Sequence, residues 1–287
     1  MTDLGKSIRT RLFNYAKKEG LPFQLVIIRY FQERLLYRLS LSQYSANFCL
    51  KGGVLQYFYS LDQTRPTRDI DFLGTNIPNE RNLMETTFQE ICSVYYPLDA
   101  VTFDSQSILA EEISGQDKYP GIRLFVNANI DTIRQRIQID VGFGDIVTPK
   151  AVQLNYPTIL PESKTPVIQA YSLETVVAEK FEAMIDLATV NSRMKDFYDV
   201  YQILTTQHLN SKDLAEAIQA TFRNRETMYT PEHALFSPSF PVDPIRLRQW
   251  KVFLTKNHLD QSIDFDEVIS QIKRRLVPIW EDLKEKD

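Results

Sequence analysis

Apolar residues recur every three or four positions over most of residues 8–38, which is the spacing of one face of an α-helix. These positions include Leu12, Tyr15, Leu25, Ile28, Phe31, Leu35 and Leu39. Gly20 and Pro22 interrupt the pattern, and both residue types disfavour the interior of a helix. The sequence therefore predicts two amphipathic helices in succession at the start of the chain.

Short apolar runs separated by turn-forming residues follow, up to residue 143. We expect strands at 48–50, 68–74, 101–113, 122–130 and 136–143, a tight turn at Gly52 and Gly53, and helices at 54–61 and from 79 to about 94. Helices between strands, followed by several strands in a row, are typical of a mixed sheet with helices packed on it. The pattern therefore predicts an α+β fold.

Beyond this point the strand signals fade. The proline-rich segment 148–171 is expected to be irregular, and a helix is predicted to begin at Ser172, with helical periodicity continuing to residue 286. We place a domain boundary between 150 and 170, and assign 1–160 to the N-terminal helices and the sheet, and 161–287 to a mostly helical C-terminal domain. The last helices either bind a substrate or pack on the first domain, and packing is the simpler expectation.

The composition is that of an ordinary globular protein, since 43% of the 287 residues are hydrophobic and 24% are charged. No apolar run approaches the roughly 20 residues that span a bilayer, and the N-terminus lacks the apolar core of a signal peptide. We therefore expect a cytoplasmic protein without a membrane segment. Because the net charge is −4, any contact with nucleic acid must come from a local basic patch.

Two aspartates stand on the predicted strand 68–74, RDIDFLG. Residues two apart on a strand point to the same face, so Asp69 and Asp71 project together, away from the apolar residues beside them. In RIQIDVGFGD, Asp140 likewise lies on the face opposite its apolar neighbours. If these two strands pair, the three acids converge on one site.

Neighbouring carboxylates repel one another unless a cation lies between them. Carboxylates, waters and phosphates are the usual ligands of Mg²⁺ in nucleotidyl transfer, and three carboxylates suit two metal ions. Gly52 and Gly53 at the start of a helix leave room for a triphosphate to approach backbone amides, and Lys51 beside them adds positive charge. The structural alternative is an Asp-x-Asp that caps a turn or pairs with a nearby arginine. The glycine pair, the paired acids and the later strand acid together favour a metal and phosphate site.

A second charged group lies on two predicted helices in LETVVAEKFEAMIDLATVNSRMKDFYDVY, residues 173–201. Taken alone, it is best interpreted as salt bridges on solvated helix faces. The functional interpretation is that Lys180 reaches nucleotide phosphates while Asp196 or Asp199 positions it. The group comprises Glu179, Lys180, Arg193, Lys195, Asp196 and Asp199.

These segments, in the order LKGGVLQYFY with RPTRDIDFLG, then IQIDVGFGD, then LETVVAEKFEAMIDLATVNSRMKDFYDVY, resemble the AbiEii family of nucleotidyltransferases. That family comprises toxins of type IV toxin-antitoxin and abortive-infection systems, and the MenT toxins belong to the same group. The resemblance spans about residues 48–204. It implies the fold of the DNA polymerase beta-type nucleotidyltransferases, a mixed sheet with flanking helices, followed here by the helical C-terminal domain.

The resemblance also implies roles for individual residues. The implied metal ligands, for Mg²⁺ or Mn²⁺, are Asp69, Asp71 and Asp140, which are also catalytic together with Lys180, Asp196 and Asp199. The implied nucleotide-binding residues are Lys51, Gly52, Gly53, Lys180, Arg193 and Lys195. Many members of the superfamily have serine where this chain has Gly53, so the chain lacks one hydroxyl contact to phosphate.

The implied activity is transfer of a nucleoside monophosphate from an NTP to an acceptor, with release of pyrophosphate. The 3′ end of tRNA is the leading acceptor, which would block translation, and an antitoxin from the same operon is the implied partner. Two alternatives stay open: an acceptor that is a protein hydroxyl or a small molecule, and a non-catalytic binding module on the same fold. A basic groove would favour RNA, and the candidate residues for it are Arg123, Arg134, Arg136, Lys273, Arg274 and Arg275.

Overall fold

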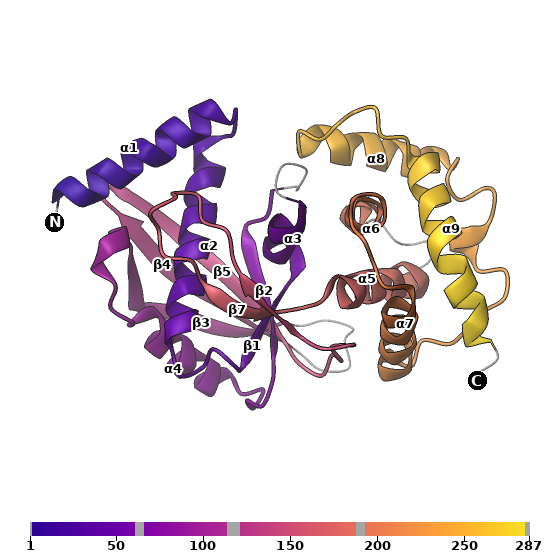
Figure 1. Cartoon of the computed structure of the whole chain (residues 1–287), viewed down its shortest axis with the longest axis horizontal. Coiled ribbons are helices and arrows are strands. Elements are labelled where there is room, and N and C mark those ends of the chain that lie inside the picture. Colours follow the sequence, from indigo (N-terminus) through magenta and orange to yellow (C-terminus); the bar gives the residue numbers. More distant parts are fainter. Residues whose placement is uncertain (1, 61–65, 114–120, 188–192, 285–287) are drawn as a thin grey trace. The chain divides into compact units, whose positions relative to one another are not determined.

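The structure is a computed structural model that describes residues 2–60, 66–113, 121–187 and 193–284 (Figure 1). The chain forms two compact units that alternate along the sequence. The first takes residues up to 58, 66–144 and 152–170, and the second takes 59–65, 145–151 and 171 onwards. The domain boundary at residue 160 stays a prediction, because these units divide the chain less simply. The ends of two predicted helices, at residues 61 and 285–286, lie outside the described residues.

The described strands of the first unit form one mixed sheet, in the order β3-β4-β5-β2-β1-β7-β6. Its strands are β1 (Phe48–Lys51), β2 (Asp69–Gly74), β3 (Thr102–Ile113), β4 (Gly121–Ile130), β5 (Ile133–Gly142), β6 (Val152–Asn155) and β7 (Val167–Ala170). β2 is antiparallel to β1 and parallel to β5, and β3, β4 and β5 form an antiparallel meander. The predicted α+β fold is therefore confirmed.

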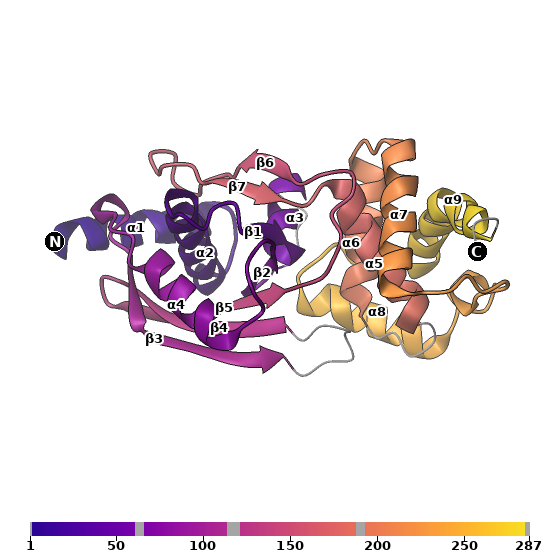
Figure 2. The same ribbon diagram turned by 90° about the horizontal axis from the view of Figure 1, so that it is seen from below.

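Helices cover one face of this sheet. The helices of the first unit are α1 (Thr2–Lys18), α2 (Phe23–Leu41), α3 (Gly52–Ser60) and α4 (Arg81–Cys92), and α2 and α4 pack against the strands on the same side (Figure 2). Ile137, Ile139 and Val141 of β5 are fully buried on that side. The residues between them are less buried, because strand residues alternate between the two faces. Within this unit, the polar residues of β2, β4 and β5 therefore share the opposite face.

The prediction that residues 148–171 are irregular was wrong for two short segments. β7 pairs in parallel with β1, and β6 pairs with β7 at the edge of the sheet. Each strand has only four residues. Pro157 stands two residues after the end of β6, and Pro166 directly precedes β7. Ile168 and Ala170 are nevertheless buried, because β7 lies inside the sheet. The contact that stabilises this strand is with a partner more than a hundred residues away, which a local pattern does not reveal.

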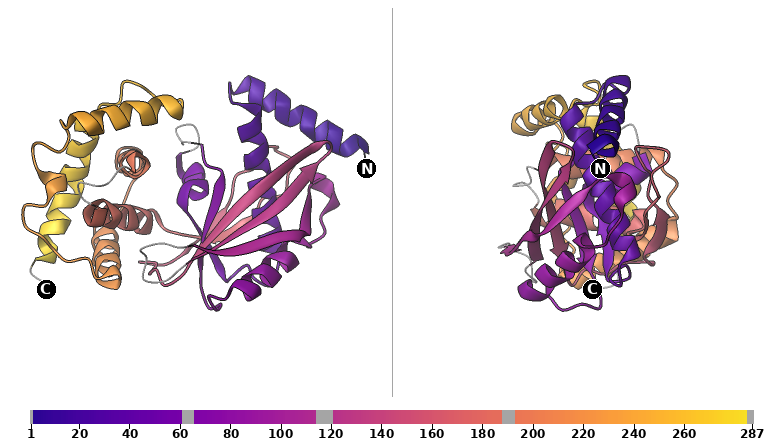
Figure 3. Two further views of the ribbon diagram at one scale, coloured as in Figure 1. Left: turned by 180° about the vertical axis from the view of Figure 1, so that it is seen from behind. Right: turned by 90° about the vertical axis from the view of Figure 1, so that its left-hand side faces the viewer.

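The second unit is helical (Figure 3). It contains α5 (Leu173–Leu187), α6 (Met194–Thr206), α7 (Ser211–Arg225), α8 (Pro244–Lys256) and α9 (Phe265–Leu283). α5 begins where predicted, and the Ser172 hydroxyl accepts a hydrogen bond from the Thr175 amide, as in an N-cap. Aromatic rings of Phe181, Phe222 and Trp280 meet in the core of this unit. In the described ranges, no helix combines the length and the apolar character needed to cross a bilayer.

Candidate active site

Four charged residues lie in one row across the middle of the sheet. The strand register places Lys51 of β1 opposite Asp71 of β2, Asp71 opposite Asp140 of β5, and Asp140 opposite Arg123 of β4. Residues directly opposite one another on paired strands point to the same face. The row therefore runs positive, negative, negative, positive on the face away from α2 and α4.

Asp69 joins this row from one pleat away on β2. One carboxylate oxygen from each of Asp69, Asp71 and Asp140 lies within 4.8 Å of the others, and all three side chains are partly buried. The sequence-based expectation that the three acids converge is thus met by the geometry. Their function as ligands stays a prediction.

Thr67 holds Asp69 in place. The Thr67 hydroxyl donates a 2.7 Å hydrogen bond to Oδ1 of Asp69, which fixes one oxygen of the carboxylate. The sequence analysis missed this residue, although the T-x-D-x-D spacing carries a signal. Residues 67, 69 and 71 share one side of an extended chain, so a short hydroxyl side chain there can reach the next acid.

Two neighbouring side chains donate hydrogen bonds to the carboxylate of Asp140. Arg123 donates from Nε to Oδ1 and from Nη2 to Oδ2, both at 2.8 Å, and Gln138 donates from Nε2 at 3.1 and 3.2 Å. These hydrogen bonds to Asp140 raise the pKa of the Arg123 guanidinium, so Arg123 stays charged. A carboxylate oxygen has two lone pairs, so Asp140 can accept from Arg123 and still offer a lone pair to a cation.

The glycine pair packs against the acids. Gly52 has a φ of +67°, a conformation that favours glycine, and a Cβ there would overlap the Asp71 carboxylate. A Cβ on Gly53 would lie 2.7 Å from the Thr67 hydroxyl oxygen. Residue 52 therefore needs glycine, while a side chain at residue 53 would displace Thr67. The missing side chains allow the first turn of α3 to lie directly beside the acids, and the contact with Thr67 disfavours serine at residue 53.

The acid cluster fits a divalent metal ion. Its donors are hard carboxylate oxygens, which Mg²⁺ and Mn²⁺ prefer, and they are close enough for one ion to bind all three. The backbone amides at the start of α3 favour binding of an anion next to the cluster, because the N-terminus of a helix carries partial positive charge. The face as a whole suits a metal-bound phosphate chain.

A second cluster lies in the helical unit. Nζ of Lys180 on α5 donates to Oδ1 of Asp196 and to Oδ2 of Asp199 on α6, both at 2.9 Å. Arg193 at the start of α6 pairs with the other oxygen of Asp196 at 2.8 Å. Burial alone would raise the pKa of Asp196, but the charges of Lys180 and Arg193 outweigh it and hold that pKa below its usual value. Asp196 therefore stays ionised, with its positive partners already in place.

The remaining predicted residues have mixed surroundings. Lys195 is exposed at the start of α6, while Glu179 accepts a hydrogen bond from the Tyr171 hydroxyl. Of the six residues predicted to form a basic groove, Arg123, Arg134 and Arg136 lie on β4 and β5 of the first unit, and Lys273, Arg274 and Arg275 lie on α9 of the second. That groove stays a prediction.

A known family and known structures resemble this chain. A family model described as the nucleotidyl transferase AbiEii toxin of type IV toxin-antitoxin systems matches residues 34–271, which confirms the resemblance seen in the sequence. The crystal structure of JHP933 from Helicobacter pylori is similar over 93% of this chain and 96% of that one, with 15% identity and a TM-score of 0.55. A candidate nucleotidyltransferase from H. pylori covers 93% of this chain and 99% of its own, with 14% identity and a TM-score of 0.54. At such low identity these structures support the fold. No curated protein matches the sequence.

Proposed function

Because the chain belongs to the AbiEii family of nucleotidyl transferase toxins of type IV toxin-antitoxin systems, we propose that it transfers a nucleoside monophosphate from an NTP to the 3′ end of tRNA. Family membership makes it a nucleotidyltransferase and implies an antitoxin as its partner. The observation that supports the proposed chemistry is the convergence of Asp69, Asp71 and Asp140 beside the glycine turn. Such a site suits a triphosphate and a divalent cation.

In this proposal the three acids hold Mg²⁺ or Mn²⁺. A cation bound there would lower the pKa of the attacking hydroxyl and neutralise charge on the leaving pyrophosphate. The amides of Gly52 and Gly53 and the ammonium of Lys51 bind the phosphates of the NTP. Thr67 and Arg123 keep Asp69 and Asp140 in position through their hydrogen bonds.

The helical cluster has a supporting role in the same proposal. Lys180, Arg193 and Lys195 supply positive charge for the nucleotide, and Asp196 and Asp199 position Lys180. Two hydrogen bonds fix the ammonium group of Lys180, which reduces the entropy lost when it binds a phosphate. The non-catalytic alternative is disfavoured, since all three acids of the sheet are present and gathered.

The test is incubation of the protein with Mg²⁺, total tRNA and each α-labelled NTP in turn. We expect one NTP to label tRNA, and Asp71→Asn to lower the rate by about a thousandfold, the scale of losing one electrostatic catalytic group. Glu112→Gln is the matched control, because Glu112 is an exposed acid on β3 outside the cluster. Label that enters a protein or a small molecule instead of tRNA would refute the proposed acceptor and leave the chemistry intact. Equal rates for Asp71→Asn and Glu112→Gln would refute the proposed site.

A further inference from the structure

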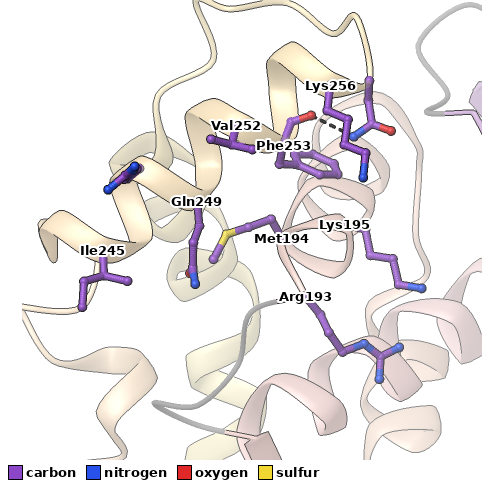
Figure 4. Close-up of a pocket in the computed structure, with 10 residues that line it drawn as sticks. Arg193, Met194, Lys195, Ile245, Gln249, Val252, Phe253 and Lys256 are labelled. Carbon is purple, nitrogen blue, oxygen red and sulfur yellow. Dashed lines mark hydrogen bonds between the residues drawn. The ribbon is translucent and has the colours of Figure 1, made fainter.

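An open groove runs along the helical unit between the start of α6 and helix α8, with a volume of about 540 Å³ (Figure 4). Its walls come from two segments that are fifty residues apart in the sequence. The residues that line it are Arg193, Met194, Lys195, Ile245, Arg248, Gln249, Val252, Phe253, Lys256 and Asn257. Three of them, Arg193, Met194 and Lys195, belong to the motif at residues 173–201 discussed above.

Helix α8 presents a distinct face to this groove. Ile245, Arg248, Val252 and Lys256 recur at helical spacing on one side of α8, while Trp250 and Leu254 are buried on the other. Ile245 and Val252 are 68% and 58% exposed, which is high for branched apolar residues. The buried side anchors α8 to its own unit, so packing in that unit does not explain the apolar and basic character of the groove face.

The charge of the groove is of one sign. Four of its residues are cationic, and of the residues described there, none that lines it is acidic. Arg193 shares its charge with Asp196, but its side chain is 49% exposed and extends along the same surface. On a chain with a net charge of −4, such a patch marks a local preference for an anion.

We propose that this groove binds the sugar-phosphate backbone of the acceptor RNA, with bases or riboses against its apolar residues. The proposal rests on the proposed function, because it takes the acceptor to be RNA. Arg248 and Lys256 are eight residues apart on α8, or about 12 Å along the helix axis. Cations spread this far along a helix match successive phosphates of an extended polyanion better than a single phosphate group. Cationic grooves with apolar surface between the charges are typical of single-stranded nucleic-acid binding.

The experiment measures the equilibrium binding of labelled tRNA at several salt concentrations, without NTP. Arg248→Gln and Lys256→Gln are each expected to weaken binding roughly threefold to tenfold, and to lower the slope of log K against log salt by about 0.7–0.9. Val252→Asp, which places a negative charge on an exposed position of the groove, is expected to weaken binding at least as much. Lys251→Gln is the matched control, because Lys251 is an exposed cation on the same helix outside the groove lining.

Each other outcome overturns the proposal. Arg248→Gln and Lys256→Gln that bind tRNA as tightly as Lys251→Gln would exclude the groove from RNA binding. A raised KM for NTP with unchanged tRNA affinity would assign the groove to the nucleotide, and loss of antitoxin binding alone would assign it to a protein partner. Labelling of tRNA by the wild type distinguishes failure of this proposal from failure of the proposed function. If the wild type labels tRNA and the groove variants bind tRNA normally, only the role of the groove is refuted. If the wild type does not label tRNA, the proposed acceptor is refuted.

Discussion

Asp69, Asp71 and Asp140 on the sheet differ from Asp196 and Asp199 on α6 in how their charge is balanced. The helical acids share the ammonium of Lys180 at 2.9 Å and are 1–2% exposed. The sheet acids lie within 4.8 Å of one another, and the strand register places Lys51 and Arg123 at the two ends of their row. The helical cluster thus holds a cation between its two acids, whereas the sheet cluster brings three acids together.

From this difference we propose that the helical cluster positions a side chain and that the sheet cluster binds a metal ion. A buried acid with a cationic partner holds that partner in one geometry, and removing the acid leaves the charge of the partner buried and uncompensated. Gathered acids repel one another, and an added metal ion relieves this repulsion. We therefore expect the loss of an acid to be destabilising in the helical cluster and stabilising in the sheet cluster without metal.

The largest expected effect is on stability. Asp196→Asn should lower the free energy of unfolding by about 3 kcal/mol, because it breaks the buried ion pair between Asp196 and Lys180. Asp69→Asn should instead raise it by up to about 1 kcal/mol, the energy of two like charges about 4 Å apart in water. Thermal unfolding without metal measures both.

Added Mg²⁺ sharpens this contrast. A ligand that binds only the folded state raises the melting temperature, so Mg²⁺ should stabilise the wild type and Asp196→Asn but not Asp69→Asn. Equal loss of stability in Asp196→Asn and Asp69→Asn would show that the sheet acids are also structural. A Mg²⁺ effect that survives in Asp69→Asn would place the ion elsewhere.

A smaller effect is expected at Gly53 and Thr67, which support the sheet cluster. In Gly53→Ser the new Cβ meets the Thr67 side chain and displaces the hydroxyl that holds Asp69, so Mg²⁺ affinity should fall about tenfold, the equivalent of one hydrogen bond to a charged group. Thr67→Gly should lose the same bond. The double variant Gly53→Ser/Thr67→Gly has room for the serine hydroxyl in place of the threonine hydroxyl.

We therefore expect the double variant to recover most of the affinity, measured by the Mg²⁺ dependence of the melting temperature. Residues in direct contact give non-additive effects of this kind. Losses that simply multiply in the double variant would show that Gly53 and Thr67 act independently of one another.

Local rules predicted the directions of the sheet acids but not their neighbours. The two-residue period of a strand predicts that Asp69, Asp71 and Asp140 avoid the core side, and they do. The register that sets Asp71 beside Asp140, and Arg123 beyond it, joins strands far apart in the sequence. Arg123 was therefore predicted as part of an RNA groove, whereas in the structure its guanidinium pairs with Asp140.

The short strands show the same limit. β6 lies between Pro149 and Pro157, and Pro166 directly precedes β7; their four-residue length gives too few alternations to detect. Parallel pairing with β1 stabilises β7, although its local sequence is a weak strand signal. Helical elements were easier to predict, since α1, α2 and α5 each contain several turns of regular apolar spacing and begin or end at proline, glycine or serine.

The smallest expected effect comes from a third kind of acid, Glu33 on α2, which is buried with a partner and yet destabilised as an anion. Its Oε1 lies 2.6 Å from Nη2 of Arg34, and its Oε2 accepts from the Ile159 amide at 2.7 Å. Burial outweighs the attraction of Arg34 and raises the pKa of Glu33 to about 7. Between the pKa of Glu33 in the unfolded chain and its raised pKa in the fold, the folded state holds a proton that the unfolded state has released. Protonated Glu33 therefore stabilises the fold at pH 5, and this stabilisation is lost as the pH rises through 7.

Relative to Glu33→Gln, the wild type should lose at least about 1 kcal/mol of unfolding free energy, or roughly 2–4 °C in Tm, between pH 5.5 and 8. The comparison concerns the change of Tm with pH, because Glu33→Gln also replaces the group that contacts Arg34 and so changes the absolute stability. Parallel Tm profiles for the two proteins would mean that Glu33 is ionised throughout, and would place it with Asp196, a buried acid that its cationic partners keep ionised.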